Sequence, residues 1–96
     1  TVSEIWLHIY DARLRRARGA ARAEVIEALE KAIDMARETG AVELELTAAV
    51  ERDRMADEGE GGAWVRPALA RAVNPQKSRA GRRAIRLAAE EDSAVA

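Results

Sequence analysis

The side chains that most often carry catalysis or bind metals are scarce in this chain. His8 is the only histidine and there is no cysteine, which excludes a cluster of imidazole ligands, a thiolate nucleophile and a cysteine-based zinc site. The carboxylate pairs Glu43/Glu45 and Glu90/Glu91 lie in charged stretches, where no apolar pocket would suit a general acid or base. We therefore predict a protein that is not an enzyme and that holds no metal and no cofactor.

One glycine-rich segment, Glu58-Gly-Glu-Gly-Gly62, has the composition of a phosphate-binding loop but not its chemistry. It lacks the Lys-Ser or Lys-Thr pair that contacts phosphate and Mg²⁺, and no strand precedes it. Its glycines also disfavour a helix. The segment is therefore predicted to be a loop between two helices.

Two basic segments have the side chains that could bind phosphate groups. Neither is interleaved with aromatic residues that would stack on bases, and their spacing does not fit a DNA-reading helix-turn-helix. The 16 basic and 17 acidic side chains of the whole chain are largely interleaved, which argues against a dedicated nucleic-acid or membrane surface. The basic residues are Arg13, Arg15, Arg16, Arg18 and Arg22 in the first segment, and Lys77, Arg79, Arg82, Arg83 and Arg86 in the second.

Apolar residues recur at three- and four-residue spacing in the first half of the chain, which predicts amphipathic helices. A first helix is expected over residues 3–17, followed by Gly19 as a left-handed stop. A second helix is expected over residues 21–39, ending at Gly40. Its apolar stripe is the most regular in the chain and consists of Val25, Ala28, Leu29, Ala32, Ile33 and Ala36.

The second half of the chain predicts three more helices. The first spans residues 42–57; its opening residues alternate as in a strand, but there is no second strand to pair with, and an isolated strand is unstable. Pro67 must lie in the first turn of the next helix, which begins near residue 63 and ends at Asn74, before a proline. A basic linker over 77–81 and a terminal helix over 82–91 complete the prediction.

Residues 19–33 and 59–73 match each other at an offset of 40. A fixed period of this size is typical of stacked helical hairpins, and such arrays act as binding surfaces. We predict one all-α domain over residues 1–96, built from roughly five helices as stacked antiparallel hairpins with a period of about 40. Its expected parts are hairpin 1 over 3–40, hairpin 2 over 42–74 and the terminal helix over 82–91.

The segment Leu29-Glu-Lys-Ala-Ile-Asp-Met-Ala-Arg-Glu-Thr-Gly-Ala41 resembles the second helix of a tetratricopeptide repeat. Together with residues 43–50, it is similar to the C-terminal repeat arrays of large bacterial signalling proteins, namely adenylate cyclases and ATPase-containing transcriptional regulators. The resemblance covers residues 3–75 and implies a non-catalytic protein-interaction or regulatory module in the cytoplasm. The period of about 40 departs from the 34 residues of that family, and Tyr10 and Val50 stand where it favours small residues.

A protein or peptide partner is expected to bind the first helix of each hairpin, where charged stripes repeat. Trp64 is expected either to fill a gap between helices or to anchor an interface. Two other functions remain open: a homodimerisation module that completes a thin core, and a small nucleic-acid-binding helical domain. No membrane partner is expected, because the apolar runs are too short to span a bilayer. The predicted partner-binding residues are Leu7, Asp11, Arg15, Thr47, Glu51, Arg54 and Trp64.

The expected core is thin. The chain has 96 residues, no phenylalanine and 3% aromatic residues, so each helix contact buries little apolar area. It also begins at Thr1 without an initiator methionine, and the helical pattern is already established by Ile5. We therefore expect a piece of a longer protein, to which neighbouring repeats or a second copy would add buried area.

Overall fold

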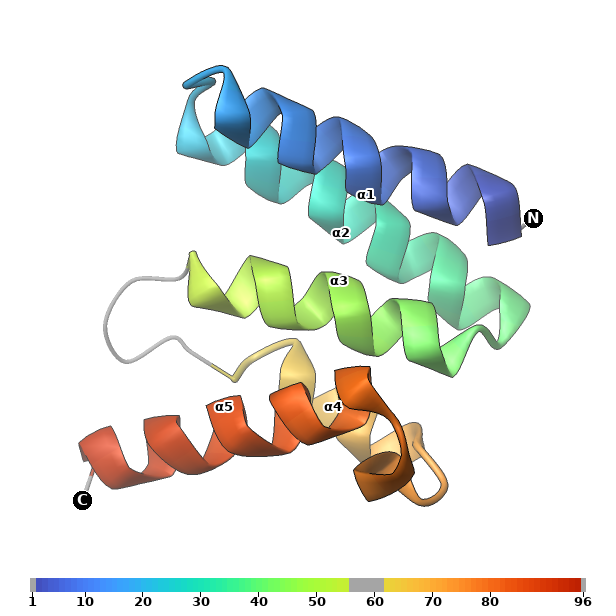
Figure 1. Cartoon of the computed structure of the whole chain (residues 1–96), viewed down its shortest axis with the longest axis vertical. Helices are drawn as coiled ribbons and strands as arrows, with labels where there is room; N and C mark the ends of the chain where they lie inside the picture. Colours follow the sequence, from blue (N-terminus) through green and yellow to red (C-terminus); the bar gives the residue numbers. More distant parts are fainter. Residues whose placement is uncertain (1, 56–61, 96) are drawn as a thin grey trace.

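The described residues form five α-helices and no strand, which confirms the all-α prediction (Figure 1). A computed structural model describes residues 2–55 and 62–95. None of the helices in these two ranges combines the length and the apolar character needed to cross a bilayer. The helices are α1 (Val2–Ala17), α2 (Arg22–Thr39), α3 (Val42–Arg54), α4 (Val65–Arg71) and α5 (Arg79–Val95), with the 3₁₀ helix η1 (Pro75–Lys77) before α5.

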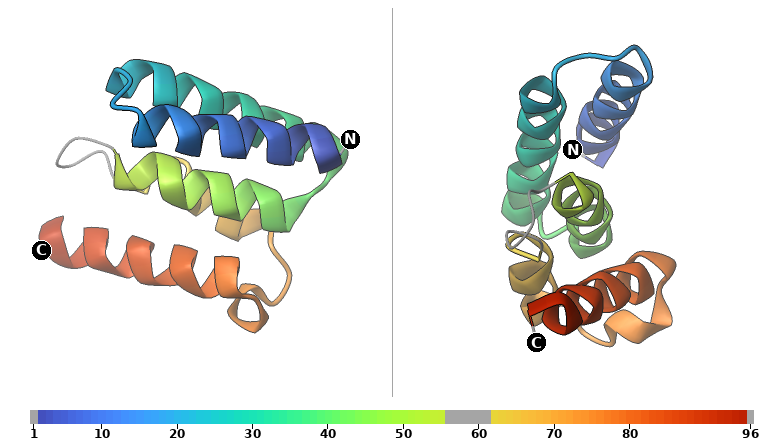
Figure 2. Two further views of the ribbon diagram at one scale, coloured as in Figure 1. Left: turned by 45° about the horizontal axis from the view of Figure 1, so that its top comes forward. Right: turned by 90° about the vertical axis from the view of Figure 1, so that its left-hand side faces the viewer.

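The helices pack mainly on their neighbours in the chain. α1 pairs with α2 and α2 with α3, while α3 packs on both α4 and α5. α1 touches α3 only lightly, so α1 lies at one edge of the molecule and α5 at the other (Figure 1). The end-on view in Figure 2 shows α2 and α4 on one side, α1 and α3 on the other, and α5 closing the end opposite α1. This arrangement leaves α1, α3 and α5 along a common surface.

Two glycines end the first two helices as predicted. Gly19 and Gly40 have φ angles of 77° and 75°, a left-handed conformation that glycine adopts without a steric penalty. After α2, the Ala41 N–H donates to the Ala36 carbonyl at 2.9 Å, as in a Schellman motif. Local backbone geometry therefore ends both helices of the first hairpin.

The core is centred on α3, which is covered by α2, α4 and α5. Ile33 and Leu46 are fully buried there, and Ile5 and Ile9 bring α1 into the same cluster. Alanines supply many of the other buried side chains of this cluster. A smaller cluster around Leu29 closes the other end of the α1–α2 pair.

The boundaries of the last three helices differ from the prediction. α3 ends at Arg54 rather than Asp57, and α4 ends at Arg71 rather than Asn74, because the backbone at Ala72 is already extended. The predicted loop over 58–62 lies almost wholly outside the described residues. Among the described residues, the helices of the second hairpin are therefore shorter than predicted.

The predicted linker over residues 77–81 is wrong, because α5 begins at Arg79 and continues to Val95. The hydroxyl of Ser78 accepts a hydrogen bond from the Gly81 N–H at 2.9 Å. A serine in this position satisfies one of the free N–H groups of a first helical turn. The Ser78 cap therefore starts the helix three residues before the predicted Arg82.

Candidate functional site

A groove with a volume of about 450 Å³ lies along the surface shared by α1, α3 and α5. Its apolar lining comes from Trp6 on α1, Leu44 and Val50 on α3, and Ala80 on α5. Leu44 and Val50 belong to the buried core, whereas Trp6 and Ala80 are half-buried. The groove is therefore held by core packing on α3 and is open to solvent between the two outer helices.

The charged lining of this groove is mostly positive. Two arginines come from α1, one from α3 and two from α5, against two glutamates from α3. The arginines and the apolar side chains line the same groove. The charged residues are Arg13, Arg16, Glu43, Glu51, Arg54, Arg79 and Arg83.

One of the five arginines is neutralised within the groove. Arg13 Nε donates to Glu51 Oε1 at 2.7 Å, which joins α1 to α3. The other Glu51 oxygen, Oε2, is buried and has no hydrogen-bond partner among the described residues. The groove therefore contains an intramolecular ion pair that retains an unused acceptor.

The other four arginines form no ion pair or side-chain hydrogen bond with any residue in the ranges described. They are Arg16, Arg54, Arg79 and Arg83, all of them exposed. Guanidinium groups have five donors in a planar fork and bind carboxylates or phosphates through paired hydrogen bonds. The groove thus presents anion-binding groups beside an apolar surface.

Three of the predicted partner-binding residues lie in this groove. Thr47, Glu51 and Arg54 are spaced along α3, and the Thr47 hydroxyl donates to the Glu43 carbonyl at 2.8 Å. Sequence periodicity was sufficient to place them together, since residues three and four apart share one face of a helix.

The predicted residues on α1 lie elsewhere. Asp11 and Arg15 pair with each other at 3.0 Å and line a separate cavity of about 190 Å³ between α1 and α2. Leu7 lies on the outward face of α1. Glu51 pairs with Arg13 rather than with Asp11 or Arg15. Arg13 lies two residues after Asp11, and two residues along a helix turn the side chain by roughly 200°, which places Arg13 and Asp11 on opposite faces of α1.

Trp64 lies just before α4, on the side of α3 away from the groove, and is half-buried. The guanidinium groups of Arg37 and Arg52 lie 5.1 Å and 5.5 Å from its ring centroid. Cations at this distance are attracted by the face of an indole ring. Of the two roles expected for Trp64, this position favours packing between helices.

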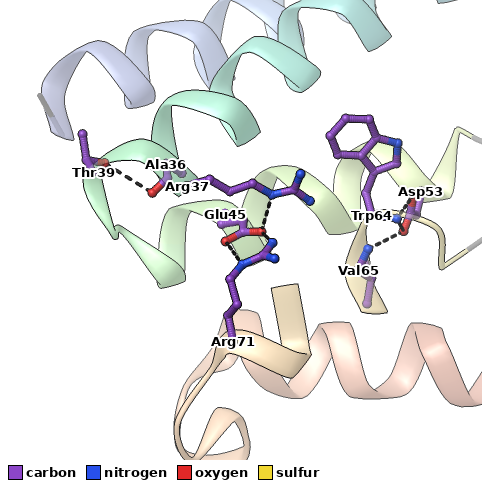
Figure 3. Close-up of polar contacts among 8 residues, drawn as sticks. All are labelled: Ala36, Arg37, Thr39, Glu45, Asp53, Trp64, Val65 and Arg71. Carbon is purple, nitrogen blue, oxygen red and sulfur yellow. Dashed lines mark hydrogen bonds and ion pairs between the residues drawn. The ribbon is translucent and has the colours of Figure 1, made fainter. Parts of the chain in front are cut away.

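The burial of Glu45 corrects the expectation from the sequence, which places this residue in a charged stretch of the chain. Glu45 is 1% exposed. Its carboxylate accepts hydrogen bonds from Arg37 Nε at 2.9 Å and from Arg71, joining α2, α3 and α4 (Figure 3). A signal was present in the sequence: Leu44, Leu46 and the alanines after Thr47 occupy more than one face of α3, which indicates a helix buried on several sides.

The two carboxylates of this region have opposite pKa shifts. Burial acts to raise the pKa of Glu45, but the hydrogen bonds and charges of Arg71 and Arg37 outweigh it, so the pKa lies below its usual value. Burial raises the pKa of Asp53, although the backbone N–H groups of Val65 and Trp64 and the charge of Arg52 act in the other direction. Both groups tie α3 to α4, which indicates a structural role.

We expect the Glu45→Gln variant to lose about 1–2 kcal/mol of stability at neutral pH, since both arginines lose their ionic partner but remain partly exposed to water. Because folding lowers the pKa of Glu45, the ionised carboxylate stabilises the folded state fully at pH values above the ordinary glutamate pKa of about 4.3. This contribution disappears as the pH falls through the folded-state pKa. Urea denaturation from neutral to acidic pH should therefore bring the variant and the parent together. The exposed Glu43→Gln change should have an effect below about 0.5 kcal/mol; a pH-independent deficit in Glu45→Gln would contradict the assignment.

The comparisons with known proteins add no relative. No family model matches this sequence, and no curated protein and no solved structure is similar to it.

Proposed function

We propose that this chain is a non-catalytic protein-interaction module that binds an acidic segment of a partner protein in the groove between α1, α3 and α5. The observation that carries the proposal is the set of four groove arginines without intramolecular partners among the described residues, beside an apolar lining. A carboxylate-bearing segment with interspersed apolar side chains would satisfy both surfaces. Rim charges of this kind steer the encounter and set specificity.

The chemistry of the groove favours binding over catalysis. Its lining offers guanidinium groups, two carboxylates and a threonine hydroxyl, while the single histidine of the chain, His8, lies in the cavity between α1 and α2. Among the described residues, no group of three or more histidine, aspartate or glutamate side chains could hold a metal ion. A peptide partner requires none of these groups.

The resemblance to tetratricopeptide arrays is part of the same proposal. α1 and α3 would be the first helices of two hairpins and α5 the first helix of a third, so the groove would be the binding face of a short array. A regulatory role in a cytoplasmic bacterial signalling protein follows from the resemblance. The arrangement of the groove supports only the array itself, because its lining comes from these three helices.

Charge reversal in the groove should remove binding of an acidic peptide. In fluorescence anisotropy with a short fluorescein-labelled peptide of alternating Glu and Leu, we expect the double variant R54E/R83E to bind at least about tenfold more weakly than the parent, because both attractive contacts become repulsive. The matched control R18E/K31E makes the same change in net charge at two exposed residues outside the groove. It should retain most of the parental affinity.

Two outcomes would overturn this function. One is an equal loss of affinity in the groove variant and the control, which would show that only net charge matters. The other is that a single-stranded oligonucleotide with as many negative charges as the peptide binds more tightly than the peptide. Its binding would depend steeply on salt concentration and would require the same arginines. That result would favour the nucleic-acid-binding alternative.

A further inference from the structure

The ion pair between Arg13 and Glu51 lies within the positively charged lining of the groove. Arg16 is three residues after Arg13 on α1, and Arg54 is three residues after Glu51 on α3. Residues three apart share one face of a helix, and all four side chains line the groove. Glu51 is therefore a carboxylate of the protein itself, bound to an arginine of the lining that would otherwise bind the carboxylate of a ligand.

The pair is weaker than an arginine–carboxylate pair can be. Arg13 Nε donates to Glu51 Oε1 at 2.7 Å, whereas Oε2 is buried and accepts no hydrogen bond from the described residues. The strongest pairs of this kind use both carboxylate oxygens in two parallel hydrogen bonds. A carboxylate oxygen that is buried without a donor also loses its hydration without compensation. A ligand carboxylate that makes the two-point contact therefore binds Arg13 more strongly than Glu51 does.

The surroundings of Glu51 contain few groups that could donate to this oxygen. Besides the groove, Glu51 borders a small cavity between α1, α2 and the end of α3. The other residues of that cavity are Ala12, Arg13, Arg16, Val25, Leu29 and Met55. The Glu51 side chain as a whole is 25% exposed, so a rotation that breaks its bond to Arg13 can bring both oxygens into water.

Arg13 is also held by groups other than Glu51. Its guanidinium lies 5.7 Å from the centroid of the Tyr10 ring, a distance at which the face of the ring attracts a cation. Tyr10 in turn stacks on Trp6, with centroids 5.3 Å apart. Because α1 packs mainly on α2 and touches α3 only lightly, opening of the ion pair leaves the packing of α1 intact. Arg13 is thus preorganised to receive a second carboxylate.

We infer that Glu51 is an intramolecular competitor of the bound segment, and that a carboxylate of that segment replaces Glu51 on Arg13. This inference rests on the function proposed above and adds Arg13 as a fifth arginine to the contacts of the segment. Glu51 then contributes to specificity. A segment with a carboxylate at this position displaces Glu51, whereas a segment without one meets a groove in which Arg13 is already neutralised.

A change that removes only the charge of Glu51 tests the competition. In fluorescence anisotropy with the peptide of alternating Glu and Leu, Glu51→Gln should tighten binding at least about tenfold, because Arg13 becomes available without displacement of a carboxylate. Glu43→Gln is the matched control. Glu43 lines the same groove but forms no ion pair with another described residue, and loss of its charge should change the affinity less than about threefold at physiological salt.

A double-mutant cycle shows whether the gain depends on Arg13. When Arg13 is replaced by Gln, the further change Glu51→Gln should improve the affinity no more than Glu43→Gln improves that of the parent. The side chains of Arg13 and Glu51 are both partly exposed, so these variants should remain folded, which circular dichroism checks.

The possible failures are distinguishable. Equal gains in Glu51→Gln and Glu43→Gln, or a tenfold gain that persists without Arg13, would show that only net charge matters and would overturn the competition. The proposed function would survive either result, provided that R54E/R83E still abolishes binding. If neither the parent nor Glu51→Gln binds the peptide, the proposed function is wrong and this inference is wrong with it.

Discussion

We expect the Asp53→Ala variant to unfold with about 3 kcal/mol less free energy than the parent. The Asp53 side chain is fully buried and accepts hydrogen bonds from the backbone N–H groups of Trp64 and Val65 at 3.0 Å and 2.7 Å (Figure 3). Its removal leaves two donors at the start of α4 without an acceptor, and each such group costs about 1–3 kcal/mol. Urea denaturation followed by circular dichroism measures the difference.

The Asp53→Asn variant is the matched control. Its amide oxygen has the size and position to accept one of the two N–H groups, so it should lose less stability than Asp53→Ala. Hydrogen exchange gives the local readout, because the Val65 amide should exchange much faster in the alanine variant. An alanine variant with the parental denaturation midpoint would contradict the assignment of Asp53 as the group that fixes α4.

The local signals in the sequence were sufficient for the first hairpin. Regular apolar spacing predicted α2 to within one residue of Arg22–Thr39, and Gly40 ended it as expected. The strand alternative for residues 42–47 was correctly rejected, since these residues open α3. Periodicity and glycine stops act within a few residues, so they can be recognised without knowledge of the tertiary structure.

Features that depend on contacts between distant residues were not predictable in the same way. The 40-residue repeat aligned Ile33 with Val73, yet Ile33 is fully buried and Val73 is highly exposed, because α4 ends at Arg71. Glu45 looked like any solvated helix glutamate, and its burial depends on arginines contributed by α2 and α4. A repeat pattern specifies which residue types recur, but the length of each helix decides whether they are buried.

The candidate groove was predictable in part. Thr47 and Arg54 share a face of α3 by spacing alone, but the arginines that complete the groove come from helices whose relative register the repeat did not define. The sequence predicts a basic cluster that includes Arg79 and Arg83, with Arg79 in a linker and Arg83 at the start of the terminal helix. The Ser78 cap extends α5 through both positions and places them one helical turn apart.

The replacement of Gly81 by alanine should cost about 2–3 kcal/mol, although the same change in an open helix is stabilising by roughly 0.5–1 kcal/mol. A Cβ atom on Gly81 would overlap the carbonyl oxygen of Pro75 and lie 2.6 Å from its carbonyl carbon. Because both atoms belong to the backbone, no side-chain rotation can relieve the overlap, and η1 must move away from α5. The sign of the change in denaturation midpoint is therefore the test.

Gly40→Ala separates this packing effect from a general intolerance of alanine. A Cβ at Gly40 meets nothing within 4 Å, but the φ angle of 75° is unfavourable for alanine, at a cost of about 1–2 kcal/mol. Gly40→Ala should thus lose stability while the contacts between η1 and α5 remain intact. Hydrogen exchange of the Gly81 amide should then change only as much as the global free energy of unfolding changes. Gly81→Ala should expose that amide preferentially, because the displaced η1 also removes Ser78 from its capping position. A Gly81→Ala variant more stable than the parent would mean that glycine is not required where η1 meets α5.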